Sequence, residues 1–143
     1  MRKYPHNLIV DTGFWIAYYE PRDTYHEQAI KKASLFDRAN ILLAWPVLYE
    51  TLNTRFVRRP NYVRDLENVV RRPGVEILDD TPFRERAYTL TLKEALRGKR
   101  PLSLTDTIIR LMLESPNIKT DYILTFNIKD YCDICAKRSI IIA

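Results

Sequence analysis

The sequence predicts an α/β fold in which a central, mainly parallel sheet lies between two layers of helices, a three-layer α/β/α domain. Strands that alternate with helices pair in parallel and are covered on both faces. Stretches with apolar residues at helical spacing separate the predicted strands. The chain of 143 residues suits a single domain, residues 1–143. Five short, mostly apolar runs are the predicted strands: residues 8–10, 41–44, 75–78, 122–126 and 139–142.

Capping residues and apolar spacing in the sequence predict the helices between these strands. Asp23 or Thr24 is expected to cap the first long helix, and Thr24 with Glu27 fits a capping box. Further along, a long helix is predicted at residues 82–96 and a shorter one at residues 107–114. These helices supply the two outer layers of the predicted fold.

The amino-acid composition indicates the cellular compartment and the kind of binding partner. The formal net charge is +5 and the sequence pI is about 9.3, which weakly favours an anionic partner. No apolar run approaches the ~18 residues that a membrane helix needs, so no membrane contact is expected. Cys132 and Cys135 have no second pair and no nearby histidine that would complete a zinc site. We expect reduced thiols in a cytoplasmic protein.

Two basic clusters stand out from this composition. Residues 55–72 hold six arginines and two acids, a net charge of +4, with Phe56 and Tyr62 interleaved. A second cluster spans residues 97–101 and precedes the acid Asp106. The first cluster is either a solvated helical hairpin or an arm that contacts phosphates, and the residues alone leave both interpretations open.

Acidic and amide side chains follow the predicted strands. Asp11 comes directly after the first strand, and Asn127 and Asp130 come just after the fourth. Glu50 and Asp106 lie in the first turns of predicted helices. In a doubly wound parallel sheet these positions converge on the edge formed by the carboxyl ends of the strands, where such folds bind their ligands.

Three of these acids also have a purely structural interpretation. Asp11 can cap the helix that follows it. Glu50 can be a solvated side chain favoured by the helix dipole. Asp106 is the last residue of a capping-box pattern that begins at Ser103.

The functional interpretation treats the acids as a group. Four carboxylates cannot lie within a few ångströms of each other unpaired, because like charges raise each other's pKa. Divalent cations remove this conflict, and oxygen ligands without competing histidine or cysteine suit Mg²⁺ or Mn²⁺. Carboxylate-held metals beside basic clusters favour hydrolysis of a phosphodiester, with the metal lowering the pKa of a bound water.

The chain resembles PIN-domain proteins over residues 8–131, through four motifs in the order and spacing of that family. The first is Ile9-Val10-Asp11-Thr12, followed by a helix start with Asp23, His26 and Ala29. The second is the helix that carries Glu50, followed by Asn53. The third is Ser103-Leu104-Thr105-Asp106-Thr107, and the fourth runs from Ile123 through Thr125, Asn127 and Asp130 to Tyr131.

The resemblance implies a Mg²⁺- or Mn²⁺-dependent endoribonuclease that hydrolyses RNA. PIN domains are typically metal-dependent ribonucleases, and many small ones resemble the toxin half of VapBC toxin–antitoxin pairs. By this resemblance Asp11 and Asp106 hold the principal metal, while Glu50 bridges to it or orients the attacking water. This chain has Asn127 where the family frequently has aspartate, and its Asn-x-x-Asp-aromatic ending is a variant of the family in which Asp130 is the expected fourth acid, catalytic and metal-binding. Asp130, supported by Asn127, then completes the site, with Asn127 as the alternative fourth ligand.

The same resemblance extends to supporting residues and partners. Thr12 and Thr125 are expected to orient carboxylates or water through their hydroxyl groups. A homodimer and a cognate antitoxin that masks the site are the implied protein partners. The residues expected to hold the RNA backbone are Arg55, Arg58, Arg59, Arg64, Arg97, Lys99 and Arg100.

Two alternatives stand beside this interpretation. One is a PIN-like RNA-binding module with weak or no catalysis, motivated by Asn127 at the fourth position. The other is a phosphatase of the haloacid-dehalogenase type, whose nucleophile also follows a first strand. That phosphatase signature needs two acids, and Asp11-Thr12-Gly13 offers one.

Overall fold

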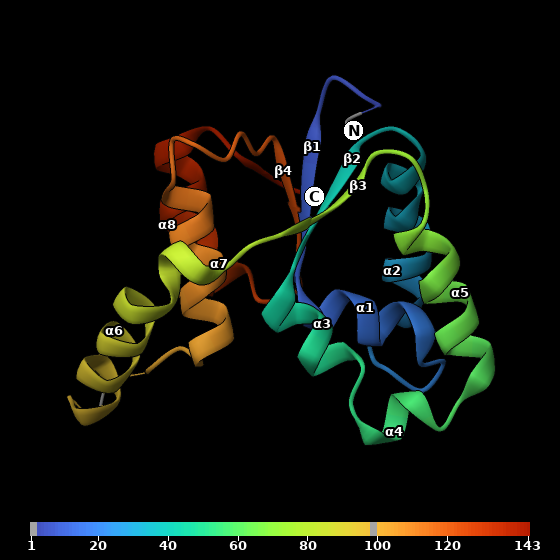
Figure 1. Cartoon of the computed structure of the whole chain (residues 1–143), viewed down its shortest axis with the longest axis horizontal. Helices are drawn as coiled ribbons and strands as arrows, with labels where there is room; N and C mark the ends of the chain where they lie inside the picture. Colours follow the sequence, from blue (N-terminus) through green and yellow to red (C-terminus); the bar gives the residue numbers. More distant parts are fainter. Residues whose placement is uncertain (1–2, 98–99) are drawn as a thin grey trace.

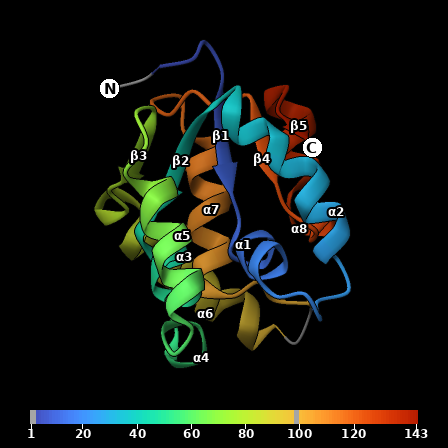
Figure 2. The ribbon, with the colours of Figure 1, turned by 90° about the vertical axis from the view of Figure 1, so that its right-hand side faces the viewer.

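A computed structural model of the chain describes residues 3–97 and 100–143. Figure 1 shows a central sheet with helices on both sides, and Figure 2 shows the molecule with one of these helix layers in front of the sheet. The elements in chain order are β1 (Asn7–Val10), α1 (Thr12–Tyr19), α2 (His26–Lys32), a 3₁₀ turn (Ala33–Asp37), β2 (Asn40–Ala44), α3 (Trp45–Thr51), α4 (Thr54–Val57), α5 (Pro60–Val70), β3 (Val75–Leu78), a 3₁₀ turn (Thr81–Phe83), α6 (Arg84–Leu96), α7 (Leu104–Glu114), β4 (Tyr122–Leu124), α8 (Ile128–Arg138) and β5 (Ile141–Ile142).

The sheet confirms the predicted fold class. Its five strands have the order β3-β2-β1-β4-β5, and each neighbouring pair is parallel. Helices α1, α2 and α5 lie on one side of the sheet, and α6, α7 and α8 lie on the other (Figures 1 and 2). The chain order reverses between β1 and β4, so the carboxyl ends of these two strands form the point where such sheets bind ligands.

The core explains why the central strands read as continuous apolar runs. Strands β1 and β2 are buried along their whole length, because helices cover both faces of a parallel sheet. The largest fully buried side chains include Trp15 and Phe14 on α1 and Tyr131 on α8. Packing of these rings against the sheet fixes α1 and α8 beside the ends of β1 and β4.

Two strands are shorter than the sequence predicts. The run at residues 122–126 forms a strand only as far as Leu124; beyond it, the Thr125 hydroxyl donates to Asp11 and accepts from the Asn127 amide at the turn into the next helix. The run at residues 139–142 pairs only at Ile141–Ile142. Ser139 caps α8 with a left-handed backbone, φ 56°, and so lies outside the strand.

Two helix starts also differ from prediction. The capping box at Thr24 and Glu27 is wrong: Tyr25 is the N-cap of α2 and makes no side-chain capping bond. Asp23 instead accepts a hydrogen bond from the Tyr25 amide at 2.8 Å and closes the preceding turn. The helix predicted at residues 107–114 begins earlier, at Leu104, with Ser103 as its cap.

The helix predicted at residues 82–96 is confirmed with a small change at its start. A 3₁₀ turn at Thr81–Phe83 precedes it, and the α-helix proper runs from Arg84 to Leu96. No helix within residues 3–97 and 100–143 is both long and apolar enough to cross a membrane.

Candidate active site

Asp11 is the most deeply placed of the candidate acids. It directly follows β1 and its side chain is 2% exposed. One carboxylate oxygen accepts a hydrogen bond from the Thr12 amide at 2.8 Å, so Asp11 does cap α1. The other accepts one from the Thr125 hydroxyl at 2.9 Å. Asp11 therefore bridges the carboxyl ends of the neighbouring strands β1 and β4.

Glu50 approaches this position from α3. Its Oε1 accepts a hydrogen bond of 2.7 Å from the hydroxyl of Thr12, the residue after Asp11. The α3 helix starts directly after β2, with proline in its first turn, and this places Glu50 in its second turn on the same edge of the sheet. The Asn53 side chain donates to the Glu50 carbonyl at 2.9 Å and caps the next helix, which fixes the end of α3.

Asp106 lies in the first turn of α7. The Ser103 hydroxyl accepts a hydrogen bond from the Asp106 amide at 3.1 Å, so Ser103 caps the helix through the Asp106 backbone. The carboxylate of Asp106 is left free for another partner. That partner is the buried hydroxyl of Tyr131, which donates to Asp106 Oδ1 at 3.2 Å.

The charges of these three acids act on one another. Burial first, and then the charges of Asp106 and Glu50, raise the pKa of Asp11 from 3.8 to about 6, against hydrogen bonds from Thr125 and Thr12 that lower it. Burial, together with the charges of Asp11, Asp106 and Asp130, also raises the pKa of Tyr131, which keeps its hydroxyl a neutral donor to Asp106. Asp11, Glu50 and Asp106 thus form one electrostatic cluster, called here the acid cluster.

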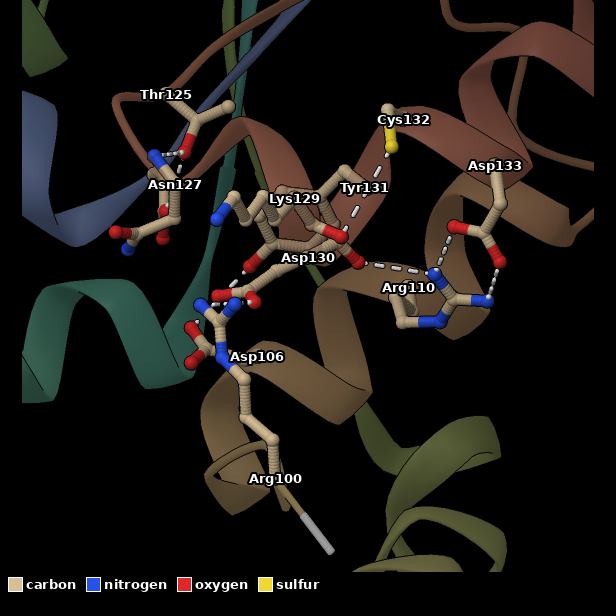
Figure 3. A network of polar contacts seen from close by, with 11 residues as sticks. Arg100, Asp106, Arg110, Thr125, Asn127, Lys129, Asp130, Tyr131, Cys132 and Asp133 are labelled. Carbon is tan, nitrogen blue, oxygen red and sulfur yellow. Dashed lines mark hydrogen bonds and ion pairs between the residues drawn. The ribbon is translucent and has the colours of Figure 1, made fainter.

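Asp130 has a different environment from these three. Its Oδ1 lies 3.1 Å from Nη2 of Arg100, in an ion pair that Figure 3 shows. Asn127 donates its backbone amide to the Thr125 hydroxyl at 3.0 Å, and its side chain is exposed. The structure therefore places both candidates for the fourth ligand near β4, but it joins Asp130 to an arginine.

The acids are not arranged as a preformed metal cage. Within residues 3–97 and 100–143, no three or more histidine, cysteine, aspartate or glutamate side chains converge closely enough to hold a metal ion. The acid cluster nevertheless has the chemistry of a Mg²⁺ or Mn²⁺ site, since all its donors are carboxylate oxygens and they repel one another.

Within the residues that the structure describes, the arginines expected to bind RNA divide into those with an ion pair and those without one. Arg55 and Arg59 both lie beside Glu20, at 3.6 and 3.4 Å, and Arg59 also donates to the Tyr62 hydroxyl at 2.7 Å. Arg58, which follows the last residue of α4, and Arg64 on α5 are exposed.

The second basic cluster is mostly engaged. Arg97 pairs with Glu94 at 3.3 Å, and Arg100 pairs with Asp130. Lys99 lies outside the described residues. Charge pairing of this kind is a property of the fold that a count of basic residues does not reveal.

Three features of the site were missed from the sequence. The Tyr131 hydroxyl holds Asp106, although the aromatic residue after Asp130 was visible in the fourth motif. Arg110 forms a two-pronged ion pair with Asp133, at 2.6 and 2.9 Å, and no local pattern marked it. A groove of about 500 Å³ runs beside Glu50, and exposed Tyr49 and Tyr88 line it.

Comparison with known proteins identifies the fold. No model of a protein family and no curated protein sequence matches the chain. Among solved structures, a chain in the crystal structure of VapBC2 from Rickettsia felis bound to a DNA fragment from their promoter matches with a TM-score of 0.59. The match has 15% sequence identity and covers 94% of this chain and 96% of that chain. At this identity the match shows that the two chains share a fold, in agreement with the PIN-like fold expected from the sequence.

Proposed function

We propose that the protein is a Mg²⁺- or Mn²⁺-dependent endoribonuclease. The observation that carries this proposal is the acid cluster, in which the buried carboxylate of Asp11 faces the charges of Asp106 and Glu50 at the junction of β1 and β4. Mutually repelling carboxylates at this junction are costly for folding unless they bind a cation. A divalent cation bound there supplies an acidified water and neutralises charge on a phosphate.

Each residue of the cluster has a role in this proposal. Asp11 and Asp106 hold the cation, and Glu50 bridges to it or orients the attacking water. The Thr125 and Thr12 hydroxyls orient Asp11 and Glu50 through the hydrogen bonds of 2.9 and 2.7 Å. Such hydrogen bonds to ligand carboxylates support metal affinity in the way that outer-sphere contacts commonly do.

Exposed arginines on the surface and a groove with tyrosines beside Glu50 suit single-stranded RNA. Arg58 and Arg64 are exposed and available to phosphates, while Tyr49, 71% exposed, and Tyr88 line the groove beside Glu50. Aromatic rings beside a basic surface stack unpaired bases without selecting their identity. The proposal therefore names RNA with unpaired bases as the substrate.

The biological setting in this proposal is a toxin–antitoxin pair in the cytoplasm. The support is the likeness in fold to a chain of VapBC2, which was crystallised with DNA from its promoter. A cognate antitoxin would cover the acid cluster and the groove beside Glu50, and the toxin itself would form a homodimer. Genes next to this one that encode a small DNA-binding protein would agree with this assignment.

An RNA-binding module without catalysis is the second candidate. Two observations favour it: Asp130 is neutralised by Arg100, and the described residues hold no preformed metal cage. The two candidates differ in one property, because only the ribonuclease loses activity when its cation is removed.

A cleavage assay on a labelled single-stranded RNA tests the proposal. Wild type, Asp106→Asn and Asp37→Asn are compared with Mn²⁺ and with EDTA. Asp37→Asn is the matched control, because Asp37 is exposed and precedes β2 at the opposite edge of the sheet. Cleavage by wild type and Asp37→Asn that stops in EDTA, with a loss of at least about a hundredfold in Asp106→Asn, supports the proposal. RNA binding without cleavage by wild type would favour the second candidate.

A further inference from the structure

Arg100 and Asp130 form an ion pair next to the acid cluster. Nη2 of Arg100 lies 3.1 Å from Oδ1 of Asp130. The Asp130 side chain is 10% exposed and that of Arg100 is 65% exposed, so the pair spans from the protein interior to solvent. In Figure 3 the Arg100 guanidinium points toward the Asp130 carboxylate on the side of Asp130 where Asp106 lies. The two partners are 30 residues apart in the sequence.

Contacts between α7 and α8 fix the direction of the Asp130 carboxylate. The Tyr131 hydroxyl bonds to Asp106 at 3.2 Å, and Nη1 of Arg110 donates to the Asp130 carbonyl at 2.9 Å. Arg110 also donates hydrogen bonds to the Asp133 carboxylate from both of its terminal nitrogens. The first turn of α8 is therefore held rigidly against α7, and Asp130 is oriented before any ligand arrives.

This arrangement makes Asp130 a poor ligand for a cation. A divalent ion bound to Asp130 would have to share the carboxylate with a guanidinium that is already within 3.1 Å, and the two positive charges would repel. Arginine, in contrast, has five N–H donors, and the pair with Asp130 occupies only Nη2. The remaining donors can bind the oxygens of a phosphate, for which arginine geometry is well suited.

We propose that Asp130 is a positioning residue that holds Arg100 beside the acid cluster, where Arg100 binds the phosphate of the RNA. The metal is then held by Asp11, Glu50 and Asp106 without Asp130. This inference rests on the proposed function, since it assigns the partner of Arg100 as the phosphate next to the bond that is cut.

The first test measures Mn²⁺ affinity by calorimetry, without RNA. The double variant Arg100→Ala with Asp130→Asn removes one positive and one negative charge, so the net charge of the site is unchanged. We expect its Mn²⁺ affinity to fall by less than about fivefold relative to wild type, because neither residue holds the metal. A larger loss would overturn the proposal, since removal of a direct ligand weakens binding by more than removal of a balanced pair.

The second test measures binding of single-stranded RNA in EDTA as a function of salt. Arg100→Ala is expected to reduce the log–log salt slope by about 0.7, the contribution of one phosphate contact on a single strand. Arg138→Ala is the matched control, because Arg138 is exposed at the far end of α8 and its removal changes the net charge equally. A slope for Arg100→Ala equal to that of wild type would overturn the proposal.

The third test shows whether Asp130 acts through Arg100. Cleavage rates are measured for both single variants and for the double variant, first at a Mn²⁺ concentration that saturates wild type and then at a higher one. We expect each single variant to lose about tenfold or more, and the double variant to lose no more than Arg100→Ala alone. Losses that multiply in the double variant, or a loss in Asp130→Asn that extra Mn²⁺ restores, would contradict the positioning role.

Failure of the inference differs from failure of the proposed function. If wild type neither binds Mn²⁺ nor cleaves RNA, the proposed function is wrong, and the salt slope in EDTA still reports whether Arg100 contacts phosphate. If wild type cleaves RNA but the double variant loses Mn²⁺ affinity, only the role of Asp130 is wrong.

Discussion

Replacement of Asp11 by asparagine should stabilise the protein at neutral pH in the absence of metal. Asp11 is buried, and its pKa is raised from 3.8 to about 6 by burial first and then by the charges of Asp106 and Glu50. Asparagine has the same shape, can accept from the Thr12 amide, and can donate to the Thr125 hydroxyl. The substitution therefore removes the charge and keeps both contacts, with the direction of the hydrogen bond to Thr125 reversed.

The magnitude follows from the shift in pKa. The folded protein binds the proton of Asp11 more tightly than the unfolded chain by about two pH units. Each unit corresponds to about 1.4 kcal/mol, so ionisation of Asp11 costs the folded state about 3 kcal/mol at most. Because the pKa of this acid is raised in the folded state, the stability that depends on a protonated Asp11 is fully present below pH 3.8. That part of the stability is lost as the pH rises through about 6.

Urea unfolding of wild type and Asp11→Asn, in metal-free buffers at pH 4 and pH 7.5, measures this effect. The difference in unfolding free energy between the two proteins should shift in favour of the variant by about 2–3 kcal/mol between the lower and the higher pH. Effects of the substitution on packing or hydrogen bonds do not depend on pH, so they cancel in this comparison. An equal difference at both pH values would refute the assignment of Asp11 as a buried, electrostatically strained acid.

Two further predictions concern the arginines of residues 55–72 and the acid Asp106. The double variant Arg58→Ala with Arg64→Ala should weaken RNA binding regardless of RNA sequence. The log–log salt slope of RNA binding, measured by fluorescence anisotropy, should fall by about 1.4. An unchanged slope would mean that residues 55–72 form a solvated face. Asp106→Asn in EDTA, which keeps an acceptor for the Tyr131 hydroxyl, should match or exceed wild type in thermal stability because like-charge repulsion is relieved, while the stabilisation by Mn²⁺ shrinks. Ser103→Ala should instead lower stability by about 1 kcal/mol and keep the full stabilisation by Mn²⁺, because Ser103 only caps α7. If the Asp106 variant lost stability and kept the full stabilisation by Mn²⁺ in thermal unfolding, Asp106 would be the structural residue.

The fold was predictable because its signals are local. Each strand of the sheet corresponds to a short apolar run, and Asp11 follows the first run directly. Parallel pairing then places the carboxyl ends of β1 and β4 together without any knowledge of side-chain contacts. The position of Asp11 at the binding edge of the sheet was therefore available from sequence periodicity alone.

The detail of the site was less predictable because it depends on contacts between distant residues. Arg100 and Asp130 were expected to have separate roles, yet the packing of α8 against α7 brings them into an ion pair. The pairing of Arg59 with Glu20 arises in the same way, since the two residues lie on different elements. Side-chain partners across packed helices leave no periodic trace in the sequence, so a count of charges overestimates the number of free arginines.

A calorimetric titration of Mn²⁺ into the metal-free protein at pH 7.5 tests most directly whether the acid cluster is a cation site. Wild type and Asp37→Asn should bind Mn²⁺ equally, and Asp106→Asn should bind it at least about tenfold more weakly, because one of the three charges that attract the ion is gone. Absence of Mn²⁺ binding by wild type, or equal binding by Asp106→Asn, would contradict the assignment of Asp11, Glu50 and Asp106 as the metal site.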